Sequence, residues 1–133
     1  MVNGILLRPY ISGIVWSMSD ASMAVLREGI GTYKAIRGDL KEMVPFFPLG
    51  FGRVNDARLA YGVRNEEKAY LSVFGIHSDT VEIPVSALGG PETAVQVLYP
   101  ASADCDVTVE GGTLRVKLPA EVSARLLEIA FDR

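Results

Sequence analysis

Cysteine and histidine, the residues that most often build metal and redox sites, are nearly absent from this sequence. Cys105 and His77 are the single examples of each. A lone cysteine excludes an internal disulfide and a cysteine-based metal centre, and His77 has no second histidine with which to share an ion. We therefore expect no metal site and no cofactor.

Basic clusters and long apolar runs are missing too. The 13 Lys and Arg residues are interspersed with 16 Asp and Glu residues, which gives a net charge of −3. This distribution offers no electrostatic footprint for nucleic acid. The apolar run near the N-terminus is too short for a membrane span or a signal-peptide core, and no small-residue cleavage site follows it. The sequence thus predicts a soluble cytoplasmic chain that contacts neither nucleic acid nor membrane.

There is nevertheless enough apolar material for a core, since 49% of the 133 residues are hydrophobic. The length suits one domain, or a small domain with a piece of another. Residues 2–7 form an apolar run without alternation, which predicts a strand buried on both faces, as in a parallel sheet. The sequence offers no second strand of this kind, so we interpret the run as an orphan strand.

An amphipathic helix is predicted next. Ser19 or Asp20 is a suitable N-cap. Gly38 is expected to cap the C-terminus, and residues 39–43 to add one further turn. The predicted apolar stripe, at spacings of mostly three and four, consists of Met23, Leu26, Ile30, Tyr33, Ile36 and Leu40.

A proline-rich junction follows the helix at residues 45–50. Pro45 and Pro48 remove backbone donors and fix φ, so neither a helix nor a central strand is expected to run through them. The apolar side chains Phe46, Phe47 and Leu49 are predicted to act as a plug that presses the preceding segment onto the following one.

The rest of the chain has a period of two. Short apolar runs are separated by Gly, Pro, Asn and Asp turns, and Gly111-Gly112 gives a strong hairpin signal. The pattern favours a mainly β fold, an antiparallel β-sandwich of about seven strands preceded by one α-helix and the orphan strand. The predicted strands are residues 57–63, 69–76, 80–85, 94–99, 105–109, 113–118 and 124–131.

No catalytic set is evident among these residues. His77 is expected in a surface turn, and Cys105 as a small buried side chain. Trp16 is of interest because it follows the predicted buried strand, where parallel-sheet enzymes place their sites. Simple packing of Trp16 against the helix is the alternative.

Three segments, in this order, resemble the C-terminal part of the α-galactosidases of glycoside hydrolase family thirty-six, the melibiase-like clan. They are Arg8-Pro9-Tyr10-Ile11-Ser12-Gly13, Glu28 to Arg37 with its Tyr33-Lys34-x-x-Arg37 pattern, and Pro45-Phe46-Phe47-Pro48-Leu49-Gly50. Residues 56–64, Leu98-Tyr99-Pro100, residues 114–119 and Ala124-Arg125-Leu126-Leu127 also fit, so the resemblance covers nearly the whole chain.

The resemblance implies a (β/α)₈ barrel followed by an antiparallel sandwich. Residues 1–44 would then hold the last barrel strand and helix, 45–50 the junction, and 51–133 the C-terminal sandwich. The family hydrolyses terminal α-galactosides with retention, using two aspartates on earlier barrel strands that this sequence does not contain. The isolated chain is therefore expected to be inactive and to lack catalytic residues. At most Ser12, Gly13 and Trp16 would form a rim of the parent's substrate site.

Two functional hypotheses remain open. In the first, the chain is the C-terminal fragment of such a hydrolase, its sandwich is an accessory domain, and a galactoside is bound only in the context of the parent barrel. An uncovered strand and helix stripe would then make the fragment a homo-oligomer. In the second, the chain is a free-standing carbohydrate-binding or protein-interaction module.

Overall fold

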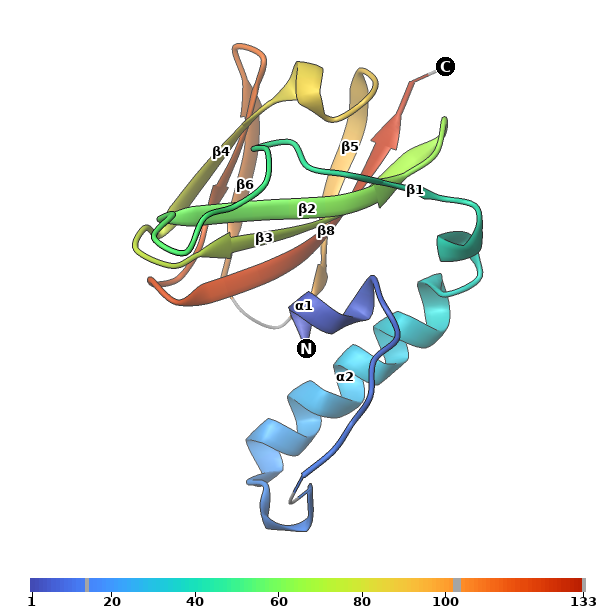
Figure 1. The fold of residues 1–133 in the computed structure, drawn as a ribbon, viewed down its shortest axis with the longest axis vertical. Helices are drawn as coiled ribbons and strands as arrows, with labels where there is room; N and C mark the ends of the chain where they lie inside the picture. The colour runs from blue at the N-terminus through green and yellow to red at the C-terminus, as the bar shows by residue number, and fades with distance from the viewer. Residues whose placement is uncertain (14, 102–103, 133) are drawn as a thin grey trace.

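The fold has a helical N-terminal part followed by two antiparallel sheets, as seen in the computed structural model in Figure 1. The structure describes residues 1–13, 15–101 and 104–132. A five-stranded sheet has the order β1-β2-β3-β8-β5, and a three-stranded sheet has the order β4-β7-β6. The helices lie against the five-stranded sheet (Figure 1), so the layers are helices, large sheet and small sheet.

All seven predicted strands are confirmed within the described residues. The small sheet consists of β4 (Thr80–Pro84), β6 (Asp106–Glu110) and β7 (Thr113–Lys117). The large sheet contains β2 (Arg58–Arg64), β3 (Lys68–Gly75), β5 (Glu92–Tyr99) and β8 (Ser123–Phe131). A short helical turn, η3 (Val85–Ala87), connects β4 to the loop before β5.

One further strand, β1 (Val44–Phe46), lies inside the junction where no strand was predicted. It pairs antiparallel with β2, with Pro45 opposite Val63. The proline is tolerated because β1 is an edge strand, whose outer side has no ladder to complete.

The predicted plug is only partly correct. Phe46 is buried in the core between the sheets, but Phe47 and Leu49 are 43% and 39% exposed. The Phe47 ring instead lies beside that of Phe51, with their centroids 4.5 Å apart. The junction therefore does not press the helices onto the sandwich.

The predicted orphan strand is wrong: this segment begins with a short helix, α1 (Val2–Ile5). Val2, Ile5 and Leu6 are buried, and their spacing of three and four places them on one helical face. No described strand pairs with this segment, whereas a helix satisfies its own backbone. Two hydroxyl groups on the sheet supply further hydrogen bonds to backbone carbonyls of α1. Tyr61 donates to the Asn3 carbonyl at 2.6 Å, and Ser72 donates to the Val2 carbonyl at 3.4 Å.

The predicted long helix is confirmed as α2 (Asp20–Ile36), with Ser19 as its N-cap. The Ser22 backbone N–H donates to the Ser19 hydroxyl at 3.2 Å. The predicted C-cap is wrong, because Arg37 is the C-cap and Gly38 has an ordinary right-handed φ of −64°. The additional turn is confirmed as η2 (Asp39–Lys41).

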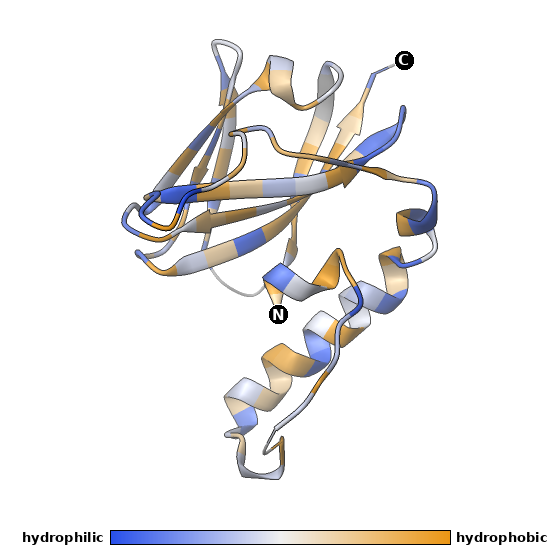
Figure 2. Cartoon of the chain, in the orientation of Figure 1, coloured by the Kyte–Doolittle hydropathy of each residue, from blue (hydrophilic) through white to orange (hydrophobic). Residues whose placement is uncertain are grey.

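Each face of the large sheet contributes side chains to a different apolar cluster. Hydrophobic and hydrophilic residues interleave along the strands (Figure 2). On β3, Leu71 and Val73 belong to the cluster between the sheets, whereas Tyr70 belongs to the cluster under the helices. On β8 the neighbours Leu127 and Leu126 divide in the same way. The helical layer therefore packs on the face of the large sheet that points away from the small sheet.

Candidate functional site

The three predicted rim residues lie in the segment between α1 and α2, which extends away from the strands (Figure 1). Ser12 is exposed and lines a hollow of about 300 Å³ together with Tyr10 and Leu26. Gly13 is exposed with a φ of +111°, a left-handed conformation that suits glycine, and it does not line this hollow.

Trp16 lies on the single helical turn η1 (Val15–Ser17), and it is 85% exposed. Packing against α2, the alternative considered from the sequence, is therefore wrong. Trp16 is not among the residues that line the hollow beside Ser12. The structure places the three residues on one exposed segment but does not join them in one pocket.

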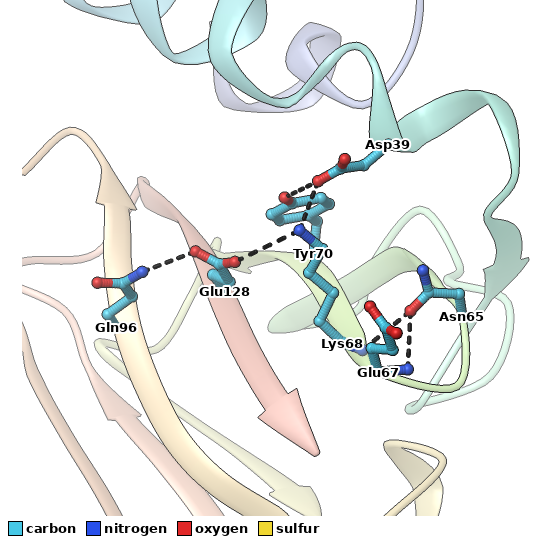
Figure 3. A network of polar contacts seen from close by, with 7 residues as sticks. All are labelled: Asp39, Asn65, Glu67, Lys68, Tyr70, Gln96 and Glu128. Carbon is cyan, nitrogen blue, oxygen red and sulfur yellow. Dashed lines mark hydrogen bonds and ion pairs between the residues drawn. The ribbon is translucent and has the colours of Figure 1, made fainter. Parts of the chain in front are cut away.

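A polar network that was not predicted lies between η2 and the large sheet (Figure 3). The Asp39 carboxylate lies 2.5 Å from the Lys68 ammonium and accepts a hydrogen bond of 2.6 Å from the Tyr70 hydroxyl. Glu128 on β8 lies 4.0 Å from the same ammonium and accepts a hydrogen bond of 2.6 Å from the Gln96 amide. The network joins four segments that are distant in sequence.

Local structure sets the positions of these groups. Asp39 begins η2 and so is held just beyond the end of α2. Lys68 begins β3, after a turn in which the Asn65 side-chain oxygen accepts hydrogen bonds of 2.9 Å from the Glu67 and Lys68 backbone amides (Figure 3). Tyr70 follows two residues later, and the strand period of two places it on the same face as Lys68.

The pKa values of three groups in this network are shifted further from neutral pH. Hydrogen bonds from Lys68 and then Tyr70 lower the pKa of Asp39, and the bond to Asp39 raises the pKa of Lys68. Burial, followed by the bond to Asp39, raises the pKa of Tyr70 to about 12. A general acid or base works best when its pKa is near the working pH, which none of these three groups approaches. The network is therefore suited to holding the helical layer on the sheet, not to proton transfer.

Cys105 and His77 lie in separate segments, before β6 and between β3 and β4. Cys105, expected to be buried, is only partly buried, and this burial raises the pKa of its thiol, which favours the protonated form. His77 is exposed in the turn between β3 and β4, as expected from the sequence. Across residues 1–13, 15–101 and 104–132, no three His, Cys, Asp or Glu side chains are grouped to hold a metal ion. None of the helices in those residues is long and apolar enough to cross a membrane.

The network was not predicted because each member, taken alone, was interpreted as an ordinary structural residue. Asp39 is typical of a helix end, and Tyr70 of an inward-facing strand residue. The available signal was the alternation of Lys68 and Tyr70, which places a charged and a phenolic group on one face of a strand. Comparison with known proteins adds no assignment: no family model matches the chain, and no curated protein matches it significantly.

Proposed function

We propose that this chain is the C-terminal region of an α-galactosidase-like hydrolase of glycoside hydrolase family thirty-six, and that its sandwich is an accessory domain supporting the barrel. The observation that carries the proposal is the ordered series of motifs in the loop at residues 8–13, in α2 and in the junction at residues 45–50. The succession of a long helix, a proline junction and an antiparallel sandwich is consistent with it.

The contacts of α2 support the accessory role. Glu28 accepts a hydrogen bond of 2.6 Å from the Ala101 backbone, and the Tyr99 hydroxyl donates to the Val25 carbonyl at 3.1 Å. With the Asp39–Lys68 pair just beyond its C-terminal end, α2 is fixed to the sheet from its middle to its C-terminus. A sandwich bound in this way can hold a barrel helix in place without contacting substrate.

The exposed apolar residues of the N-terminal part support a covering partner. They include Leu7, Tyr10, Ile11, Trp16 and Met18 on the segment before α2, and Val25 on α2 itself. In the parent enzyme the rest of the barrel would cover them, and a galactoside would be bound only there. In the isolated chain a second copy would cover them, which makes the fragment a homo-oligomer.

A second function, carbohydrate binding by a free-standing module, is favoured by one observation. Tyr10 and Trp16 are 86% and 85% exposed on the same segment, and exposed aromatic rings are suited to stacking on sugars. The strands of the two sheets offer little of this kind, because Tyr70 and Tyr99 are buried.

Calorimetric titration of the isolated chain with galactose and raffinose separates the two functions. The accessory role predicts no saturable heat from either sugar. Saturable heat that is abolished by Trp16→Ala and retained by Phe51→Ala would establish the binding module and overturn the proposal. Phe51 is the matched control because it is also an aromatic residue, 82% exposed, but lies beyond the junction.

A further inference from the structure

Four basic side chains line one hollow beside the C-terminal end of α2. The hollow has a volume of about 740 Å³, and its basic residues are Arg8, Lys34, Arg37 and Lys41. None of the described acidic residues lines it. Within the described part of the chain, none of the four forms an ion pair. The hollow therefore presents concentrated positive charge with no internal counter-ion.

The helix dipole accounts for only half of this charge. Lys34 and Arg37 lie at the end of α2, where cations are favoured by the partial negative charge of the helix. Arg8 comes from the segment after α1 and Lys41 from η2, so their presence at the hollow needs another reason. Of the two acidic residues nearest to Arg37 and Lys41 along the chain, Asp39 is engaged by Lys68 and Tyr70, and Glu42 does not line the hollow.

The gathering of charge is also unusual for this protein. The net charge is −3, and the remaining nine of the 13 basic residues are outnumbered by 16 acidic ones. Four like charges on a concave surface repel one another and focus a positive field into the space between them. An anion that enters the hollow relieves this repulsion.

The lining selects the kind of anion. Arginine guanidinium groups match the geometry of phosphoryl oxygens, and lysines add point charges. A single carboxylate would leave most of the charge unbalanced, whereas a phosphoryl group brings about two negative charges. Tyr33 and Leu40 supply a phenol and an apolar wall for the rest of the molecule. The volume lies in the range of small-molecule sites, and the acidic remainder of the surface disfavours a long polyanion.

We propose that this hollow binds a small molecule that carries a phosphoryl group. The hollow lies at the C-terminal end of α2, whereas Trp16 precedes the other end of this 17-residue helix, which is about 25 Å long, and neither Ser12 nor Gly13 lines the hollow. It is therefore independent of the rim assigned above, and it does not rest on the proposed glycosidase origin.

Calorimetry and backbone NMR on the whole chain test the site at fixed ionic strength. The probes are inorganic pyrophosphate, glucose 6-phosphate and unphosphorylated glucose. The proposal predicts saturable binding of both phosphoryl compounds with a dissociation constant of about 1 mM or tighter, and no binding of glucose. Chemical-shift changes should centre on Lys34, Arg37 and Lys41.

Charge-neutralising variants distinguish a site from a general field. Arg37→Gln and Arg8→Gln should each weaken binding about tenfold, because each removes a charge-assisted contact. Arg27→Gln is the matched control, since Arg27 is exposed on the same helix but does not line the hollow, and it should change affinity by less than about twofold. Arg8 lies outside the helices, so its variant keeps the test valid if Arg37→Gln perturbs α2.

Three results would overturn the proposal. The first is an absence of saturable shifts up to about 10 mM of either phosphoryl probe. The second is an equal loss of affinity in Arg27→Gln and Arg37→Gln, which would indicate a diffuse field. The third is binding of glucose as tight as that of glucose 6-phosphate, which would show that the phosphoryl group is not recognised.

Discussion

The carboxylate of Asp39, on the turn after α2, lies 2.5 Å from the ammonium of Lys68 at the start of β3. These residues are far apart in sequence, and their contact fastens the end of the helical layer to the large sheet. Because the Asp39 side chain is 39% exposed, solvent screens the pair and limits its contribution.

Asp39→Asn should lower the free energy of unfolding by about 1 kcal/mol, because it removes the ion pair and weakens the bond from Tyr70. Urea denaturation measures the change. Asp79→Asn is the control, since Asp79 pairs with Lys117 at the exposed rim of the small sheet, and a smaller loss is expected. An equal loss in both variants would show that the Asp39 network has no special role.

The stabilisation by Asp39 should disappear in acid. The pKa of Asp39 is lowered in the folded state from an ordinary value of 3.8. Its contribution is therefore fully present above about pH 4 and is lost as the pH falls through the folded value. The difference in unfolding free energy between the wild type and Asp39→Asn, measured from pH 7 downwards, should shrink below pH 4. A difference that grows in acid would contradict the assignment.

Two glycines in α2 should respond differently to substitution by alanine. A Cβ at Gly31 meets nothing within 4 Å, so Gly31→Ala should stabilise the protein by up to about 1 kcal/mol through helix propensity. A Cβ at Gly29 would lie 3.0 Å from the buried ring of Tyr99, so Gly29→Ala should gain less or lose stability. Thermal unfolding of both variants measures the difference. Equal stabilisation by both would show that α2 does not pack closely on β5.

Neighbouring leucines on β8 should report on different layers. Leu127 is fully buried between the sheets, and Leu127→Ala should lower the global unfolding free energy by about 2–5 kcal/mol. Leu126 is equally buried but faces α1 and α2, so Leu126→Ala should also increase hydrogen exchange in α2 selectively. Selective exchange of α2 in the Leu127 variant instead would reverse the assignment of the two faces.

Much of this fold follows from local patterns in the sequence. The period of two and the glycine turns located seven strands, and Ser19 located the start of α2, because pleat alternation and capping are local properties. The interpretation of residues 2–7 failed because Val2, Ile5 and Leu6 fit a helical face as well as they fit a buried strand, and pairing partners decide between the two. The junction strand β1 was missed because its prolines are acceptable only at a sheet edge, which is a property of the whole topology.

The site was less predictable than the fold. The network of Asp39, Lys68 and Tyr70 and the basic hollow beside α2 each assemble residues from separate segments, and no local spacing signals their approach. The exposure of Trp16 likewise depends on what the rest of the fold leaves uncovered.

Light scattering tests whether the chain forms the proposed oligomer. The exposed apolar residues before and along α2 should associate, so the purified chain should scatter as a dimer or larger at micromolar concentration. Trp16→Ser combined with Tyr10→Ser should shift it towards monomer. A monodisperse wild-type monomer would contradict the proposal.

The central claim, that this chain is the C-terminal part of an α-galactosidase-like enzyme without its own catalytic pair, is tested most directly by hydrolysis of a chromogenic aryl α-galactoside. Retaining hydrolysis needs two carboxyl groups about 5 Å apart, and both of them are expected in the barrel. The purified chain alone should show no turnover above buffer, whereas a family thirty-six barrel whose own last helix and sandwich are replaced by residues 20–133 should be active. Two results would contradict this claim. The first is turnover by the chain alone that is abolished by an Asp→Asn change within it. The second is a chimera that is insoluble or inactive under conditions in which the parent enzyme is active.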